Sequence, residues 1–265
     1  MRLAWLTDIH LDHLDHEAIG DLAVNVIEEQ PDAVLVTGDI SIARYLEVHL
    51  GALANAWSVP TYFVLGNHDF YGSSIAALRE RCAEITKTSE WLRWLPACGV
   101  VSLTDKTALV GHDAWADARA GDPDDPKIRM RDWRVIKDFV DLDDEERKAR
   151  LREEGDLAAA YLADVLPRAM ATHDEVVVAT HPPAFVEACR YKGRISPPFF
   201  LPHLVCMAAG EAIRAAAAAH PDTPTLCLAG HTHGHARETL APNLRAWTGE
   251  ATYGSPAVQL VLDLP

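Results

Sequence analysis

The sequence predicts an α/β layered fold whose strands form a mixed sheet or two stacked sheets. Apolar runs of strand length indicate strands buried on both faces, and helical patterns separate the early runs, which is typical of α/β proteins. Toward the carboxyl terminus, "RAWTGE" and "AVQLVLDL" have strand character with no helical pattern between them, so a purely parallel sheet fits less well. The five main apolar runs end in polar or glycine-containing loops and lie at 2–8, 32–39, 60–69, 174–183 and 224–233.

Three segments have helical patterns, at 14–30, 73–85 and 141–166. The last is highly charged, and its acidic cluster at 143–146 is placed where negative charge stabilises the first turn of a helix. The preceding stretch "DARAGDPDDPKIRMRDW" is polar and contains two prolines. We therefore expect a single domain over 1–265, with residues 117–160 forming a cap or insertion.

Composition limits the function classes. The chain has 265 residues, 49% of them hydrophobic, and a formal net charge of −15, which argues against broad binding to nucleic acid or to an anionic membrane. No apolar stretch approaches the ~18 residues of a membrane span, and "MRLAWLTDIH" is too short for a signal peptide. The five cysteines show no Cys-x-x-Cys spacing. We expect reduced thiols in a cytoplasmic protein.

Each of the five apolar runs ends in residue types that bind metal ions. Ligands gather at the carboxyl ends of strands in α/β sheets, so these side chains are expected to meet at one edge. Any one of the motifs alone is weak, because an isolated histidine or Gly-Asp pair is common. The set comprises Asp8 and His10, then Asp39, then Asn67, His68 and Asp69, then His181, and finally His231 and His233.

The motifs "DIH", "GD", "GNHD", "THPP" and "GHTH", in this order from residue 8 to 233, resemble the calcineurin-like metallophosphoesterase superfamily. The chain is most similar to its small bacterial phosphodiesterase-like branch. The resemblance implies a two-sheet β-sandwich flanked by helices, in four αββα layers. It also implies a dinuclear metal centre, because no ligand position of the pattern is missing.

Carried over residue by residue, the resemblance implies two groups of metal ligands that share Asp39. Oxygen and nitrogen ligands without thiolate suit two ions of Mn²⁺, Fe or Zn²⁺. Two such ions about 3.5–4 Å apart lower the pKa of a bridging water and bind phosphoryl oxygens. The first group is Asp8, His10, Asp39 and His233, and the second is Asp39, Asn67, His181 and His231.

The same resemblance gives His68 the role of the acid that protonates the leaving group, with Asp69 orienting its ring. The alternative for His68 is a hydrogen-bonding role without chemistry. Four other histidines match no ligand position and are expected to be structural or solvent-exposed: His13, His16, His112 and His235.

The expected function is hydrolysis of a phosphodiester, such as a cyclic nucleotide or a nucleotide derivative, by metal-activated hydroxide. Phosphomonoesterase and pyrophosphatase activities are alternatives on the same fold, and a non-catalytic scaffold is a more remote one. A metallo-β-lactamase-like site would need a His-x-His-x-Asp-His block, and an amidohydrolase-like site an opening His-x-His strand. The partner is then a small phosphate ester, and the oligomeric state stays open.

Two basic stretches stand out in this acidic chain, "KIRMRDWR" at 127–134 and "CRYKGR" at 189–194. They are either surface charge paired with nearby carboxylates or contacts to substrate phosphate. Of the two, the second stretch is favoured because it follows His181 closely, and a tyrosine is expected beside the leaving group. The candidates are Arg129, Arg131, Arg190, Lys192 and Arg194, with Arg190 and Arg194 preferred, and Tyr71 or Tyr191.

Overall fold

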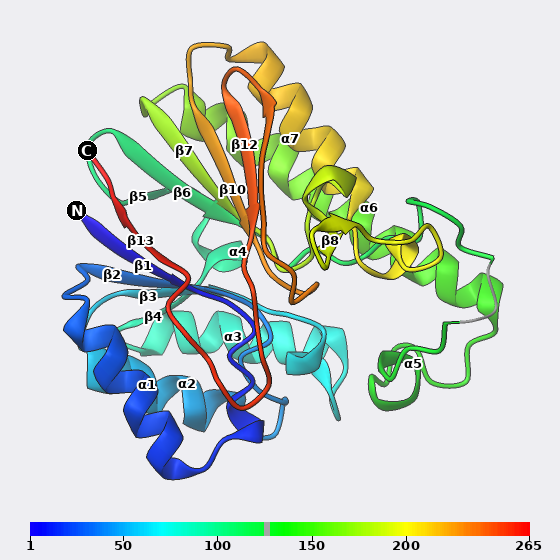
Figure 1. Cartoon of the computed structure of the whole chain (residues 1–265), viewed down its shortest axis with the longest axis horizontal. Helices are drawn as coiled ribbons and strands as arrows, with labels where there is room; N and C mark the ends of the chain where they lie inside the picture. The colour runs from blue at the N-terminus through cyan, green and yellow to red at the C-terminus, as the bar shows by residue number, and fades with distance from the viewer. Residues whose placement is uncertain (125–127) are drawn as a thin grey trace.

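Two β-sheets pack against each other in the centre of the molecule, and helices cover their outer faces (Figure 1). The computed structural model describes residues 1–124 and 128–265. Side chains from both sheets interdigitate between them, among them Trp5, Leu35, Leu109 and Leu228. The predicted two-sheet sandwich flanked by helices is confirmed.

The first sheet has the strand order β13-β1-β2-β3-β4, in which β13 alone is antiparallel to its neighbour. Its strands are β1 (Arg2–Leu6), β2 (Ala33–Thr37), β3 (Thr61–Val64), β4 (Leu92–Trp94) and β13 (Leu260–Asp263). Its helices are α1 (His16–Glu28), α2 (Leu46–Trp57) and α3 (Ile75–Thr88). Because β13 pairs with β1, both termini lie at the same edge of the molecule (Figure 1).

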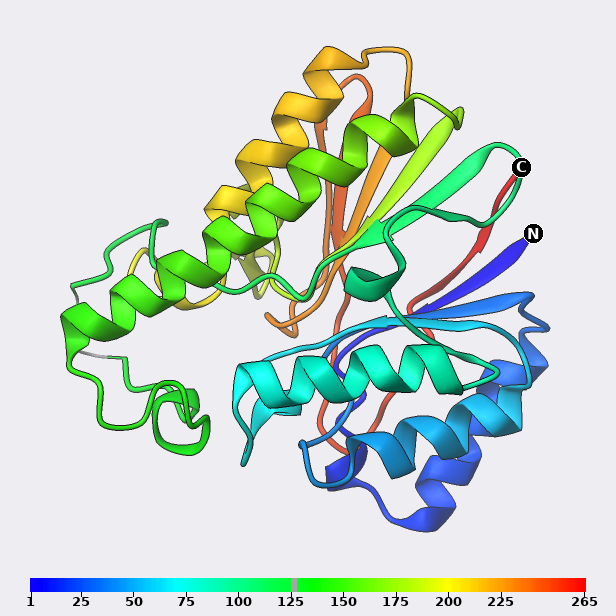
Figure 2. The same cartoon turned by 180° about the vertical axis from the view of Figure 1, so that it is seen from behind.

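The second sheet has the order β11-β12-β10-β7-β6-β5, with antiparallel pairs only at its two ends. Its strands are β5 (Val101–Ser102), β6 (Thr107–Gly111), β7 (Glu175–Ala179), β10 (Thr225–Ala229), β11 (Ala236–Ala241) and β12 (Leu244–Thr248). The helices α6 (Asp144–Met170) and α7 (Met207–Ala219) lie side by side over this sheet (Figure 2). The antiparallel neighbours β11 and β12 are joined by a short turn, which explains why the carboxyl-terminal part of the chain has strands with no helix between them.

Shorter elements connect these layers. A two-stranded hairpin, β8 (Arg190–Tyr191) and β9 (Arg194–Ile195), precedes α7. Single helical turns make up the rest: α4 (Leu95–Cys98), α5 (Asp132–Val135), η1 (Leu11–His13), η2 (His68–Phe70), η3 (Val186–Ala188) and η4 (Leu201–His203).

Local sequence accounts for the helix boundaries. Asp15 accepts a hydrogen bond from the Ala18 amide at the start of α1. At the start of α6, Asp143 and Glu146 form a reciprocal capping box, which confirms that the acidic cluster lies at a helix amino terminus. Such caps satisfy amides that have no partner within the helix.

The five cysteines are unpaired, four of them buried and Cys98 half-buried. Burial raises the pKa of the buried thiols, for example that of Cys206 to about 12. Across the described residues, no helix has both the length and the apolar character needed to cross a membrane.

The predicted insertion at 117–160 ends inside α6, which continues to Met170 and packs through Leu162 and Leu166. Residues 125–127, including the first residue of the basic stretch 127–134, lie outside the described residues. The part that leads into α6, residues 128–143, is called the connecting segment below. Its Phe139 is fully buried against Trp115, with ring centroids 5.5 Å apart. The connecting segment is thus anchored in the hydrophobic core.

A buried ion network joins α3, α6 and the loop after β6. Arg79 donates to Asp113 at 3.1 Å and to Glu154 at 2.8 Å, and both carboxylates are fully buried. The other oxygen of Asp113 accepts from the Leu65 amide, at 2.8 Å. The network therefore supports the chain just before the "GNHD" motif.

Replacing Arg79 with methionine is expected to destabilise the protein by about 3–5 kcal/mol, because the buried carboxylate of Asp113 loses its cation and that of Glu154 keeps only Arg150. Urea denaturation measures the change. Lys87→Ala on the same helix is the control, since its pair with Glu84 is exposed on both sides and contributes at most about 0.5 kcal/mol. Similar losses in the two variants would contradict a structural role for the buried network.

Candidate metal centre

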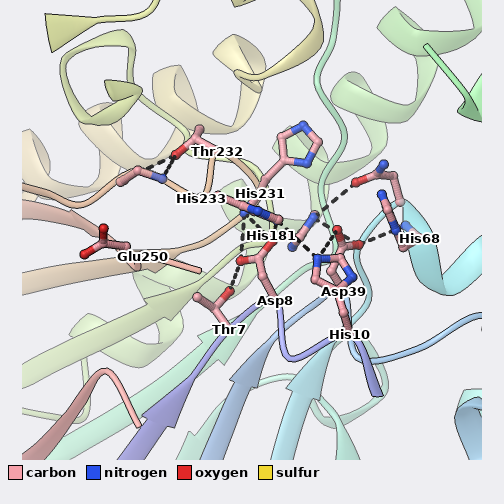
Figure 3. A network of polar contacts seen from close by, with 12 residues as sticks. Thr7, Asp8, His10, Asp39, His68, His181, His231, Thr232, His233 and Glu250 are labelled. Atoms are coloured by element: carbon pink, nitrogen blue, oxygen red, sulfur yellow. Dashed lines mark hydrogen bonds and ion pairs between the residues drawn. The ribbon is translucent and has the colours of Figure 1, made fainter. Parts of the chain in front are cut away.

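The loops that follow five strands meet at one edge of the sandwich. β1, β2 and β3 of the first sheet and β7 and β10 of the second all direct their carboxyl ends there. The structure brings together all seven predicted ligand side chains, six of which Figure 3 labels, with Asp39 at the centre.

Five of these seven residues have left-handed backbone, with φ between 40° and 70°. This conformation is uncommon for residues with a side chain and persists only where the surroundings enforce it. Here backbone hydrogen bonds cross between loops, from the Asp8 amide to Gly38 and from the His10 amide to Asp39, both at 3.0 Å. The five are Asp8, His10, Asp39, His231 and His233.

The motif glycines make room for the ligand side chains. A Cβ on Gly66 would lie 2.1 Å from Oδ1 of Asp39, and one on Gly230 would lie 2.1 Å from Oδ2 of Asp8. Neither position accepts a side chain without moving a carboxylate. The glycines of "GNHD" and "GHTH" are therefore packing requirements of the site.

The first group of ligand atoms comes from Asp8, His10, Asp39 and His233, all within 4.8 Å of one another. The Nε2 atoms of His10 and His233 are 3.2 Å apart, and Nε2 of His233 is 3.4 Å from Oδ1 of Asp8. Buried nitrogen and oxygen lone pairs that converge in this way fit a cation between them. The donor set matches the expected first metal.

The second group contains Asp39, His181 and His231. Oδ1 of Asp39 lies 3.3 Å from Nε2 of His181, whereas its Oδ2 faces His10 at 3.9 Å. Asn67 joins this group, because its Oδ1 is 3.3 Å from the same nitrogen of His181. The two oxygens of Asp39 thus face different groups, as a bridging carboxylate must.

Hydrogen bonds to backbone carbonyls select the free nitrogen of two rings. Nδ1 of His181 donates to the Thr37 carbonyl at 2.8 Å, and Nε2 of His231 donates to the His203 carbonyl at 2.9 Å. A carbonyl only accepts, so Nε2 of His181 and Nδ1 of His231 are left for a metal ion. Such contacts fix ring orientation in metal sites.

Electrostatics favours the protonation states that metal binding requires at Asp39, His10 and His231, but not at His181. Burial would raise the pKa of Asp39, but His181 and His68 hold the pKa of this carboxyl well below its usual value. Burial lowers the pKa of His10 and of His231 to about 4, so both rings are neutral at neutral pH. Burial opposes protonation of His181 as well, yet Asp39 raises its pKa to about 10. His181 therefore carries a proton that a bound cation would displace.

His68 lies beside both groups, and its ring touches neighbouring aromatic side chains. It stacks on Tyr71, with centroids 4.4 Å apart and planes at 27°, and meets His10 edge to face at 4.8 Å. Its backbone amide donates to Oδ1 of Asp39 at 2.8 Å. The ring of His68 thus lies next to both ligand groups without belonging to either.

The expected role of Asp69 requires a correction. Its carboxylate is fully buried, and both oxygens accept backbone amides: Ile40 and Ser41 at 2.9 and 2.8 Å, and Gly66 at 2.7 Å. With its oxygens placed there, Asp69 joins the "GD" and "GNHD" loops instead of orienting the ring of His68. Sequence adjacency was misleading because η2 turns consecutive side chains in different directions.

An open cleft of about 460 Å³ lies over the two groups. Besides the predicted Asp39, Asn67, His68, His231 and His233, it is lined by side chains of the connecting segment and of the loop after β12. Tyr71 lines it too, although its ring is buried and its hydroxyl donates to Asp132 at 3.3 Å. Sequence reasoning missed Asp132 and Tyr253, because neither lies in a recognisable motif.

The basic side chain that lines the cleft is not one of the two that the sequence analysis preferred. Arg190 is bound to Glu238, at 2.7 Å from Nε, so the preference for it as a phosphate ligand was wrong. Arg194 is exposed on β9, and Lys192 lies over the ring of Tyr191. Arg131 instead lines the cleft, with its guanidinium 5.3 Å from the ring centre of Tyr71. The connecting segment, not the hairpin, supplies a cation to the site.

Arg129 lines a separate cavity next to Lys148. The unassigned histidines lie outside both ligand groups. His112 is buried and accepts from the Ala114 amide at 3.0 Å, while His16 begins α1 and His235 is exposed. His13 approaches the ring of His10 edge to face, at 6.0 Å.

Comparison with known proteins agrees with this geometry. The calcineurin-like phosphoesterase family model matches residues 1–235, which include every motif of the centre. No curated protein sequence matches the chain.

Among solved structures, the chain is similar to a dimetal phosphatase from Danio rerio, with 17% identity and a TM-score of 0.61 over 97% of this chain and 89% of that one. It is also similar to the phosphopantetheinyl hydrolase PptH from Mycobacterium tuberculosis, with 17% identity and a TM-score of 0.59 over 95% and 89%. GAP50, the anchor in the inner membrane complex of Plasmodium, has 12% identity and a TM-score of 0.51 over 99% and 77%. These structural likenesses show the fold alone; on the family match, the chain belongs to the calcineurin-like phosphoesterase family.

Proposed function

We propose that this protein is a metal-dependent hydrolase of phosphate esters, and that its preferred substrates are phosphodiesters. The observation that carries the proposal is the placement of Asp39, whose two oxygens face two separate groups of ligand side chains beneath an open cleft. Nitrogen and oxygen donors without thiolate suit Mn²⁺, Fe or Zn²⁺. Two such ions, when bound, supply Lewis acidity toward phosphoryl oxygens and activate water as the nucleophile.

The protein's own groups then position the ester and move a proton. Arg131 faces the cleft and binds a non-bridging phosphoryl oxygen through its guanidinium. His68 donates a proton to the oxygen that leaves phosphorus, which prevents an alkoxide from departing as an anion.

Charge favours a diester over a monoester. Among the described residues that line the cleft, Arg131 is the only lysine or arginine. A phosphodiester carries a single negative charge, which one guanidinium matches, whereas a monoester carries nearly two at neutral pH. The open cleft, at about 460 Å³, is also large enough for a phosphate that carries two ester groups.

The test is a panel of a phosphodiester, a phosphomonoester and a pyrophosphate that share one chromogenic leaving group, assayed with Mn²⁺. We expect the highest kcat/KM for the diester. A clear preference for the monoester would contradict the diester proposal. Absence of turnover on every ester, with metal bound, would contradict the hydrolase proposal and favour a scaffold.

Arg131→Ala is expected to raise the KM for the best diester about tenfold, equivalent to ~1.4 kcal/mol, while kcat changes little. Arg190→Ala is the matched control, since its guanidinium is paired with Glu238 outside the cleft lining. Steady-state kinetics on both variants measures the difference. An unchanged KM in Arg131→Ala would remove this residue from the substrate site.

A further inference from the structure

Asp132 lies where the connecting segment meets the metal centre. It is the first residue of α5, and only 6% of it is exposed. It lines both the open cleft and a small cavity of about 30 Å³ between the ligand side chains and the connecting segment. A buried carboxylate is costly unless it accepts hydrogen bonds, so its partners indicate its role.

One partner is Asn67, whose side chain lines both of these cavities together with Asp132 and hydrogen-bonds to its carboxylate. A carboxylate accepts, so the NH₂ group of Asn67 must face Asp132. The amide oxygen then points the other way, where it lies 3.3 Å from Nε2 of His181 in the second ligand group. Without a partner for the NH₂ group, the amide could rotate and present nitrogen, which does not bind a metal ion, to that group.

The other partner is Tyr71, whose hydroxyl donates to Oδ2 of Asp132 at 3.3 Å. The ring of Tyr71 stacks almost parallel on the ring of His68, at 27°. Asp132 therefore fixes Tyr71 at one end, and Tyr71 supports one side of His68.

The connecting segment holds Asp132 firmly in place. Its backbone bonds to the chain that follows the "GNHD" motif, with the Gly72 amide donating to Val135 at 2.9 Å and the Lys137 amide donating to Ser73 at 3.0 Å. Ile136 is fully buried in the core of the same half of the molecule. These backbone hydrogen bonds and the buried Ile136 thus hold the Asp132 carboxylate at the site.

We propose that Asp132 is a positioning residue that directs the amide oxygen of Asn67 toward the second metal group and, through Tyr71, holds the ring of His68. The role rests on the proposed function, and its second part, support of the His68 ring, is the one that the family resemblance implied for Asp69. It is carried by a segment more than sixty residues away from the motif it serves.

The primary experiment is calorimetric titration of Mn²⁺ into metal-free protein. Wild type is expected to bind two ions. Asp132→Ala is expected to bind one ion normally and the other 10–100-fold more weakly, the usual effect of losing a partner that orients a metal ligand. Asp132→Asn retains the size and one acceptor oxygen, so we expect an intermediate loss at the same single site.

Asp138→Ala is the matched control. Asp138 belongs to the connecting segment and accepts from the Ile75 amide at 2.8 Å, at the start of α3. It anchors the segment as Asp132 does, but no described contact joins it to Asn67 or Tyr71. Both Mn²⁺ affinities should therefore equal those of wild type.

Tyr71→Phe separates the two arms of the proposal. It removes the hydroxyl and keeps the ring, so both metal affinities should be retained. The kcat for an ester with an alkoxide leaving group should fall about fivefold, the loss of one ordinary hydrogen bond. A nitrophenolate ester, which needs little protonation, should show a smaller loss, and KM should not change.

Wild-type affinity at both sites in Asp132→Ala would overturn the proposal, and so would equal losses in Asp132→Ala and Asp138→Ala. If Asp132→Ala does not fold, as judged by its melting transition, the comparison of Asp132→Asn with Asp138→Ala decides in the same way. A wild-type protein that binds two ions but hydrolyses no ester would contradict the proposed function, whereas the titrations would still support Asp132.

Discussion

Asp39→Ala is expected to abolish ester hydrolysis and to lower the metal content from two ions per chain to less than one. The substitution removes a ligand from both groups at once, because Oδ1 faces His181 and Oδ2 faces His10. It also removes the acceptor for the His68 amide. Metal analysis after purification and turnover of the best diester measure the two effects.

Glu250→Ala is the control for a nearby carboxylate. Glu250 is exposed and lies at the periphery of the network in Figure 3, outside both ligand groups. It should retain two ions and normal turnover. Chelation should abolish wild-type activity reversibly, so activity that survives complete metal removal would rule out a metal-dependent mechanism.

His68→Ala is expected to lower kcat by about 10²–10⁴-fold, the usual contribution of a positioned general acid. The bound metal should stay at the wild-type level, because the contact of His68 to Asp39 comes from its backbone amide. The loss should be large for an alkoxide leaving group and much smaller for nitrophenolate, which leaves without a proton.

His235→Ala provides the comparison, as an exposed histidine two positions from a ligand. It should match wild type on both substrates. Equal losses of kcat on alkoxide and nitrophenolate esters in His68→Ala would show that the ring positions substrate instead of donating a proton.

The sequence, together with its family resemblance, was sufficient to predict the two layers of strands and the meeting of the seven ligand side chains. Each ligand lies within a few residues of a buried apolar strand, so the direction of the strands determines where it goes. Asp8 after β1 and His231 after β10 are 223 residues apart, yet the His231 amide donates to Asp8 at 2.9 Å. The position of each ligand can therefore be predicted from the motif and the end of the strand that precedes it.

The surroundings of the ligands were not predictable in the same way. Asp132 reaches Tyr71 only because Ile136 and Phe139 bury the connecting segment in the core, a tertiary contact with no periodic signal. The prediction for Arg190 rested on closeness in sequence to His181, but pairing with Glu238 on β11 turns its guanidinium away. Distance along the chain is a poor guide once loops of irregular backbone intervene.

The left-handed backbone at five ligand positions has an evolutionary consequence. Glycine adopts positive φ without steric penalty, so at these positions the backbone alone would favour a residue that has no ligand atom. Selection for heat resistance and selection for catalysis therefore act in opposite directions on the same codons. In a lineage that no longer needs the activity, we expect these five aspartate and histidine residues to be replaced first. The β-sandwich itself would persist.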